Sequence, residues 1–486
     1  MLAACAPAAT STPVVASQTP TRVATLTPFP TATEAPTPTP VNYIEGLDHV
    51  PMPESALIEE VVSPDYLRVM GLTRSQVNLT YVERKDSKGV PFVIMLDRTS
   101  GVPLALAMKT GSSDLSWKWE YASLSKLARR KGLDMNARAY LVTEYDRKIS
   151  MDVATTFQMD MVGANLPMFN QTFDWSKVTA NWDEVRAQLL QGKIPFENEV
   201  FDSKTVAMVE NEARFTRLEG LGYDGDVLFY PTMLDDPAIK ALSPKDQKTV
   251  LFFMAAAKLL KFPEFKKIDL ESEVIGYNQR EPYATMYKQL GGNDFLVELA
   301  FFAKQVKPEI ILIVTEDLMY CNFPRVRGYL YPYYIDAYDN FFKLLKELKD
   351  KQAPLDEVKL ENNMWTLSMP DRELLRTTLR RIKDLGYQIA APDALVSAAD
   401  TWLFWSDAPV TTPLKPGETH DQRRAEIYTM LLEVYLQEGS TNFGFHSTTD
   451  IAMPAGQQNN DIFDINELPK RDYYLLMKTI FDSLPD

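Results

Sequence analysis

Two short apolar stretches of the sequence end in polar side chains that could bind or act on a ligand. The first, residues 273–281, carries Asn278 and Gln279 after its apolar part, and the second, residues 387–393, ends in Asp393. Buried parallel strands of this kind deliver side chains to the carboxyl-terminal rim of an α/β barrel. An amide or a carboxylate at such a rim can hydrogen-bond hydroxyl groups, and a carboxylate can also act as a nucleophile or a base.

Short apolar runs alternate with helix-like stretches from about residue 119 onward. The predicted strands are 133–137, 156–162, 222–230, 273–278, 308–315, 356–362, 389–391 and 439–446. The clearest helical patterns are 123–130, 246–260, 295–304, 338–349, 371–385 and 423–436. Eight alternations predict a (β/α)8 TIM barrel over residues 118–486, and no early strand is followed by the Gly-rich loop of a dinucleotide-binding fold.

The residues just beyond the strands of such a barrel gather at one face. The polar residues at these positions are Asp226, Tyr230, Asn278, Gln279, Thr315, Glu316, Asp317, Glu361, Asn363, Asp393, His446 and Asp450. We therefore expect any ligand to bind among them.

A segment of different character, residues 42–117, precedes the barrel. Residues 77–83 alternate apolar and polar, a Gly-containing turn follows at 86–89, and an apolar run occupies 90–96. This pattern is typical of a β-hairpin, and a further run at 104–108 adds a third strand. We predict a small β-rich N-terminal extension packed on the barrel.

The order of the motifs resembles glycoside hydrolase family 10, the endo-β-1,4-xylanases. The family's strand-three motif G-H-T-L-V-W-H is similar to residues 225–231, and its strand-four motif V-V-N-E to residues 276–279. Its strand-five motif N-D-Y is similar to residues 315–317.

The later motifs of the family follow in the same order. P-I-D-G-I-G-L-Q-x-H is similar to residues 354–363, I-T-E-L-D to 391–395, and V-W-G-x-T-D to 445–450. The closing F-D-x-N-x-x-P-K-P-A-Y is similar to residues 463–473. The resemblance covers about residues 121–484 and implies a barrel that engages a β-1,4-linked polysaccharide such as xylan, with no cofactor.

The resemblance places Gln279 and Asp393 where the family has its two catalytic glutamates. Gln279 can hydrogen-bond a glycosidic oxygen but has no proton to deliver, and Asp393 is one methylene shorter than glutamate. We therefore expect hydrolysis to be weak or lost, as in a pseudoenzyme. An alternative is an active glycosidase of altered specificity, in which Asp393 acts with Glu281 or Glu316 as the acid. A third hypothesis is a non-catalytic envelope or assembly protein that reuses the barrel.

Polar and aromatic side chains around this pair are candidates for sugar binding. The predicted substrate-binding residues are Asn278, Asp226, Tyr230, Glu361, Asn363, Trp402, Trp405 and His446. The aromatic rings, together with Trp365, have the shape to stack on sugar faces, although core or loop packing is the alternative for each of them.

The composition argues against several other functions. The formal net charge is -15 with no basic tract, which disfavours nucleic acid as a partner. Cys5 and Cys321 are the only cysteines, and the three histidines stand at unrelated spacings, so we predict neither a disulfide framework nor a metal centre.

The N-terminal residues indicate export to the cell surface. Residues 2–5, ending in Cys5, resemble the lipobox of bacterial lipoproteins, here behind a truncated signal. Residues 6–41 are rich in Pro, Thr and Ala, a composition typical of an extended linker. We therefore expect a secreted or lipid-anchored surface protein that contacts the membrane only through its anchor.

Overall fold

The computed structural model describes most of the chain from residue 42 to the C-terminus. The described residues are 42–111, 116–137, 169–170, 172–203, 206, 225–226, 237–263, 266–271, 275, 283–317, 337–398, 410, 412–445, 462–464 and 468–486. Cys5, the predicted linker 6–41 and the predicted second strand 156–162 lie outside them. Within the described part of the chain, no helix is long and apolar enough to cross a membrane.

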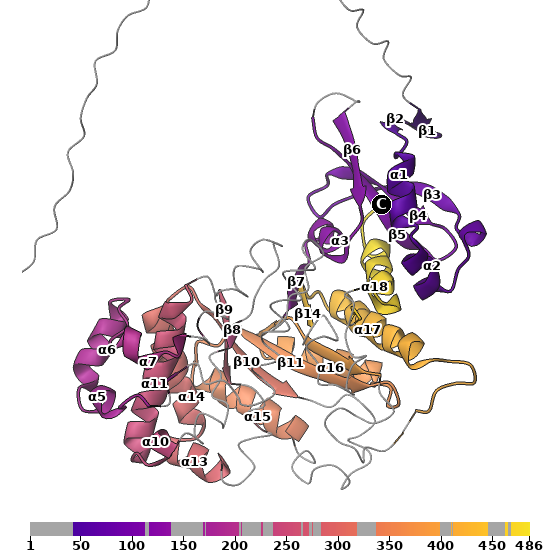
Figure 1. The fold of residues 1–486 in the computed structure, drawn as a ribbon. Helices are drawn as coiled ribbons and strands as arrows, with labels where there is room; N and C mark the ends of the chain where they lie inside the picture. The colour runs from indigo at the N-terminus through magenta and orange to yellow at the C-terminus, as the bar shows by residue number, and fades with distance from the viewer. Residues whose placement is uncertain are drawn as a thin grey trace, which may run out of the picture. The chain divides into compact units, whose positions relative to one another are not determined.

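An antiparallel sheet forms the N-terminal extension (Figure 1). Its strands, in sheet order, are β3 (Leu79–Lys85), β4 (Pro91–Asp97), β5 (Val102–Lys109) and β6 (Trp117–Tyr121). The predicted hairpin is confirmed, because β3 pairs with β4 around a turn in which Asp86 Oδ1 accepts hydrogen bonds from the backbone amides of Lys88 and Val90. The extension ends slightly later than the predicted residue 117, since β6 pairs with β5.

Two smaller units precede this sheet. They are the hairpin of β1 (Tyr43–Ile44) with β2 (Leu47–Pro51) and the helices α1 (Ser55–Val61) and α2 (Pro64–Met70). The hairpin is tied to the sheet by Trp119, whose indole donates to the carbonyl of Pro51 at 2.7 Å.

A second sheet, entirely parallel in its described pairs, forms the larger part of the molecule. Its strands are β7 (Asp134–Ala137), β8 (Gly225–Asp226), β9 (Lys267–Glu271), β10 (Ile311–Asp317), β11 (Glu357–Trp365), β12 (Gln388–Ile389), β13 (Asp393–Ser397) and β14 (Asn442–Phe445). They follow the order β7-β14-β13-β11-β10-β9-β8, with β12 also beside β11. Because the first strand lies beside the last and the others follow chain order, this is the strand order of a (β/α)8 barrel. The predicted strand 156–162 falls between β7 and β8 in the sequence.

Helices connect these strands as predicted. They are α3 (Leu124–Lys131), α11 (Pro244–Lys261), α14 (Asn293–Val306), α15 (Ala337–Asp350), α16 (Arg372–Asp384) and α17 (His420–Gln437), with α18 (Arg471–Asp482) at the end. Local signals begin them: Ser243 caps α11 ahead of Pro244, Asp371 caps α16, and Thr419 forms a capping box with Gln422 in α17. Further short helices, α5 (Ser176–Thr179), α6 (Trp182–Leu190), α7 (Glu197–Val200), α10 (Pro237–Lys240) and α13 (Tyr283–Leu290), complete the described set.

The fourth strand lies earlier in the sequence than predicted. We expected it at residues 273–278, but β9 spans Lys267–Glu271, and Ile275 has helical backbone. Charged residues alternate with apolar ones in β9, a pattern that usually indicates a solvent-exposed face. Here Ile268 and Leu270 are buried in the hydrophobic core, and Asp269 is also fully buried.

The last helix, α18, connects the two sheets. A buried ion pair joins Arg424 of α17 to Asp472 of α18 at 2.8 Å, with both side chains fully buried. On the other side, Tyr474 packs edge-on against Tyr66 of α2 with ring centroids 5.2 Å apart. The guanidinium of Arg84, in β3, lies over the ring of Phe481.

Removing one partner of the Arg424–Asp472 pair tests its importance. We expect Asp472→Ala to lower the free energy of unfolding by about 3 kcal/mol, because the Arg424 charge stays buried and, of its described ion-pair partners, keeps only the half-exposed Asp421, at 3.2 Å. Denaturant titration followed by circular dichroism measures this change. Asp350→Ala is the matched control, since it breaks the exposed Lys346–Asp350 pair, which we expect to change stability by less than about 0.5 kcal/mol. Equal effects of the two substitutions would show that burial of the pair is unimportant.

Candidate functional site

The interior of the barrel is lined by charged residues. Val358 and Leu360 of β11 pack in the hydrophobic core with the surrounding helices, so the alternate residues Glu357, Lys359 and Glu361 lie on the opposite, inner face. All three are at most 5% exposed. Charges buried to this extent need partners.

Ion pairs between β9 and β11 supply partners for two of these charges, those of Glu357 and Lys359. Lys359 Nζ lies 2.8 Å from Asp269 Oδ2, with side chains 3% and 0% exposed. Lys267 Nζ lies 2.8 Å from Glu357 Oε2. Because β10 runs between β9 and β11, both pairs reach across one strand, which is the layered packing of a barrel interior.

Above these pairs, three acidic residues occupy register-paired positions on neighbouring strands. Asp317 of β10 pairs with Glu361 of β11, which pairs in turn with Asp393 of β13. The structure thus brings together Glu361 and Asp393, two of the predicted site residues. The sequence predicts Asp393 at the end of a strand, whereas in the structure it is the first residue of β13.

A bulge in the seventh strand of the barrel, which comprises β12 and β13, produces this pairing. Val358 pairs with Ile389 and Glu361 with Asp393, so three steps along β11 correspond to four steps along strand seven. The extra residue falls around Pro392, which separates β12 from β13. Without it, Pro392 rather than Asp393 would pair with Glu361.

Glu316 does not belong to this inner face. It pairs with Leu360, on the side of β10 and β11 that packs against the helices, and is fully buried there. Its Oε2 accepts a hydrogen bond from the backbone amide of Ile275 at 2.7 Å. The prediction of Glu316 as a substitute acid is therefore corrected, because its carboxylate holds the chain after β9.

The placement of β9 also separates Gln279 from the strand end. The strand-four motif of the resemblance directly follows its strand, whereas Gln279 stands eight residues beyond Glu271. Strand β9 ends at Glu271, and in the sequence Leu270-Glu271 continues as Ser272-Glu273. This tetrapeptide, like V-V-N-E, ends in glutamate.

Several predicted site residues lie outside the described part of the structure. These are Asn278, Gln279, Glu281, Tyr230, Trp402, Trp405 and His446. For Asp226 and Asn363 the structure gives the strand positions, with Asp226 paired to Asp269 and Asn363 to Leu395. Trp365 is only 2% exposed, so its ring packs in the core, the alternative to sugar stacking that was given for it.

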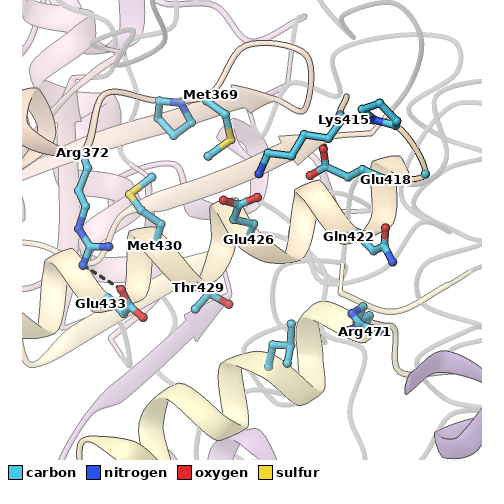
Figure 2. A pocket seen from close by; sticks show the side chains of 14 residues that line it. Met369, Arg372, Lys415, Glu418, Gln422, Glu426, Thr429, Met430, Glu433 and Arg471 are labelled. Atoms are coloured by element: carbon cyan, nitrogen blue, oxygen red, sulfur yellow. Dashed lines mark hydrogen bonds and ion pairs between the residues drawn. The ribbon is translucent and has the colours of Figure 1, made fainter. Parts of the chain in front are cut away.

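A cavity of about 910 Å³, not expected from the sequence, lies beside α17 and the beginnings of α16 and α18 (Figure 2). Its lining residues are Met369, Pro370, Arg372, Lys415, Pro416, Gly417, Glu418, Gln422, Glu426, Thr429, Met430, Glu433, Arg471 and Leu475. Figure 2 shows Arg372 reaching Glu433, at 2.8 Å. Because these side chains come from separate segments, no local motif could have indicated them. The lining combines carboxylates with one lysine and two arginines, groups that can bind a charged or polar ligand.

Hydrogen bonds hold the described end of the segment between β13 and α17 beside this cavity. Arg423, only 1% exposed, donates from Nε and Nη2 to the two carboxylate oxygens of Glu418 at 2.8 and 2.6 Å. Thr366 Oγ1, just after β11, lies 2.7 Å from His420 Nδ1. These contacts fix the loop that follows strand seven to the turn that follows strand six.

Comparison with solved structures identifies the fold. Xylanase 10B from Thermotoga petrophila RKU-1, in complex with xylobiose, superposes with a TM-score of 0.51 at 15% identity over 75% of this chain and 98% of that one. Native xylanase 10B from Thermotoga maritima gives 0.50 at 16% identity over 74% and 99%. The chain therefore has the (β/α)8 fold of the family 10 xylanases, and the resemblance found in the sequence is confirmed for the fold.

Sequence comparison gives a shorter match. A β-1,4-xylanase of Dictyoglomus thermophilum is 26% identical over 93 residues, which are 19% of this chain. The chain thus matches about a quarter of that curated relative, 25% of its length. No model of a protein family matches the chain.

The Glu418–Arg423 pair predicts a pH-dependent contribution to stability. The hydrogen bonds from Arg423 lower the pKa of Glu418 from 4.5 to about 2. A depressed carboxyl pKa stabilises the fold above pH 4.5, and this contribution disappears as the pH falls toward 2. We expect the difference in unfolding free energy between the wild type and Glu418→Gln to shrink over this range, as measured by urea titration at a series of pH values. A difference that stays constant with pH would contradict the assignment.

Proposed function

We propose that this protein binds β-1,4-linked polysaccharide such as xylan at the carboxyl-terminal end of the barrel and hydrolyses it. The row of register-paired acids Asp317, Glu361 and Asp393, in a barrel with the family 10 xylanase fold, is the observation that carries this proposal. Ligands of (β/α)8 barrels bind at this end of the sheet. One of the solved neighbours holds xylobiose, which supports a xylan-type ligand.

Asp393 is the carboxylate that we assign as nucleophile. The bulge in strand seven pairs it with Glu361, a residue that faces the barrel interior. The side chain of aspartate is one methylene shorter than that of glutamate, and a displacement of about 1 Å at a reacting centre can cost about 10²-fold in rate. We therefore expect slow rather than absent turnover.

Glu273 replaces Gln279 as the proposed acid. Glu273 stands two residues after the end of β9 in the sequence. Two residues further, the backbone amide of Ile275 donates a hydrogen bond to the carboxylate of Glu316, near the end of β10. A retaining glycosidase needs its two carboxyl groups about 5–5.5 Å apart. Strands β9 and β13 belong to the same parallel sheet, with β11 and β10 between them. The expectation that hydrolysis is weak or lost rests on Gln279 as the acid, whereas the bounds of β9 favour Glu273 for this role.

Kinetics on two substrates test the proposal. We expect the wild type to release reducing ends from xylan and to cleave an activated aryl xyloside. Glu273→Gln should lower xylan turnover by about 10²–10⁴-fold and spare the aryl xyloside, because a good leaving group needs no acid. Asp393→Asn should abolish both activities. Gln279→Ala is the matched control and should change xylan turnover by less than about threefold.

Other outcomes separate the remaining hypotheses. Loss of xylan turnover in Gln279→Ala but not in Glu273→Gln would return the acid position to the segment around Gln279. Binding of xylan without any turnover would favour a polysaccharide-binding protein. Failure to bind any xylan, glucan or mannan in calorimetric titration would overturn the proposal in favour of an assembly role.

A further inference from the structure

We propose that the cavity beside α17 is a second binding site, separate from the barrel interior, which takes a sugar acid: a ligand with one carboxylate and several hydroxyl groups. None of the residues that line it belongs to a strand of the parallel sheet. Its volume of about 910 Å³ lies within the range of roughly 300–1,000 Å³ that is typical of small-molecule sites. Binding in this cavity therefore does not depend on the hydrolysis proposed for the barrel.

The acidic residues that line the cavity already have arginine partners. Arg372 lies 2.8 Å from Glu433, and Arg423 donates to both carboxylate oxygens of Glu418 at 2.8 and 2.6 Å. Glu426, whose side chain is half exposed, lies 3.7 Å from the guanidinium of Arg423. Each of these carboxylates thus has an opposite charge nearby, and each keeps lone pairs that can accept further hydrogen bonds.

Two cations of the lining have no such partner. Within the described part of the chain, neither Lys415 nor Arg471 forms an ion pair. Lys415 is exposed, and Arg471 donates from Nη1 to the carbonyl oxygen of Met70 at 3.4 Å. A lysine and an arginine without carboxylate partners are the groups with which proteins bind the carboxylate or phosphate of a ligand.

Both cations lie at the same end of the cavity. The buried pair between Arg424 and Asp472 places the start of α18, where Arg471 stands, beside the first turns of α17. Lys415 is held at this end as well, because its backbone amide donates to the carboxylate of Glu418, just before α17. An anionic group bound at the beginning of α17 can therefore contact both cations.

Hydrogen-bond acceptors continue along α17 from that end. Gln422, Glu426 and Glu433 all line the cavity and extend over about 16 Å of the helix at 1.5 Å per residue (Figure 2). Carboxylate oxygens only accept hydrogen bonds, so the hydroxyl groups of a ligand are suitable donors for them. Met369 and Met430 add apolar surface for the carbon atoms of a sugar ring.

This mixture of charges favours a carboxylate over other ligand groups. A phosphate monoester carries about -1.5 to -2 charges near neutral pH, so Glu418 and Glu426 repel it more strongly than they repel a carboxylate. A neutral sugar forms no ion pair with Lys415 or Arg471. A sugar acid offers one negative charge to these cations and hydroxyl groups to the acceptors along α17.

Calorimetric titration with matched small molecules tests this proposal. The probes are glucuronic acid, glucose, which has a hydroxymethyl group in place of the carboxylate, and inorganic phosphate. Near neutral pH we expect glucuronate to bind at least about tenfold more tightly than either of the others. Because Lys415 is exposed, the affinity for glucuronate should fall several-fold as the salt concentration rises from about 0.1 to about 1 M.

Substitutions locate the binding in this cavity. Lys415→Gln should weaken glucuronate binding at least about tenfold, whereas Lys415→Arg, which keeps the charge, should stay within about threefold of the wild type. Arg471→Gln, checked by circular dichroism for folding, should give a loss similar to that of Lys415→Gln. Lys346→Gln is the matched control, because it removes an exposed lysine charge from α15 and should change the affinity by less than about twofold.

Oligosaccharides distinguish two sources of the sugar acid, a free molecule and a branch of a polysaccharide. Asp393→Asn protein, which should not cleave the chain, is titrated with a xylo-oligosaccharide with and without a glucuronic acid branch. Tighter binding of the branched chain that is lost on adding Lys415→Gln supports the site as a receptor for polysaccharide branches. Binding of glucuronate without any gain from the branch supports it as a site for free sugar acids.

The remaining outcomes separate failure of this site from failure of the proposed function. Absence of saturable glucuronate binding, equally tight binding of glucose, or tighter binding of phosphate overturns the sugar-acid site and leaves xylan hydrolysis untouched. Undiminished glucuronate binding in folded Lys415→Gln and Arg471→Gln proteins also overturns it. If glucuronate binds as expected but xylan is neither bound nor cleaved, the proposed function fails and the sugar-acid site stands.

Discussion

The buried ion pair between Lys359 and Asp269 is the interaction on which the barrel interior depends. Its two side chains are almost inaccessible to water, so each charge can stay in the interior only while the other is present. Because the pair reaches across β10, it fixes β9 and β11 relative to each other as well as filling the space between them. The register-paired positions of Asp317, Glu361 and Asp393 follow it on neighbouring strands of the same sheet.

A small irregularity in one strand then decides what this row contains. The extra residue around Pro392 changes the register of strand seven between β12 and β13 and so pairs Asp393 with Glu361. Proline is tolerated at such a point because a bulge leaves one amide out of the sheet ladder. The ion pairs hold the strands below the acidic row, and the bulge decides which residue of strand seven pairs with Glu361.

Much of the fold could be predicted from the sequence, and the error in strand four shows where prediction failed. The helices α11 and α14 to α17 have local signals, namely capping residues and apolar periodicity, and the structure confirms them. Strand β9 has no such signal, because its charged residues look exposed until their partners on β11, ninety residues away, are known. The prediction for Gln279 depended on that strand position, and it stays a prediction. The bulge beside Asp393 and the burial of Glu316 likewise depend on pairing between distant segments, which no local pattern reveals.

The position of α18 has a consequence for how the chain is made. Residues of the first sheet, such as Arg84, and of the helix before it, such as Tyr66, pack against a helix that lies far downstream in the sequence. On the ribosome the N-terminal sheet emerges first, yet it cannot acquire this packing until α18 has been synthesised. The apolar surface that packs against α18 therefore stays uncovered while the whole parallel sheet is being made.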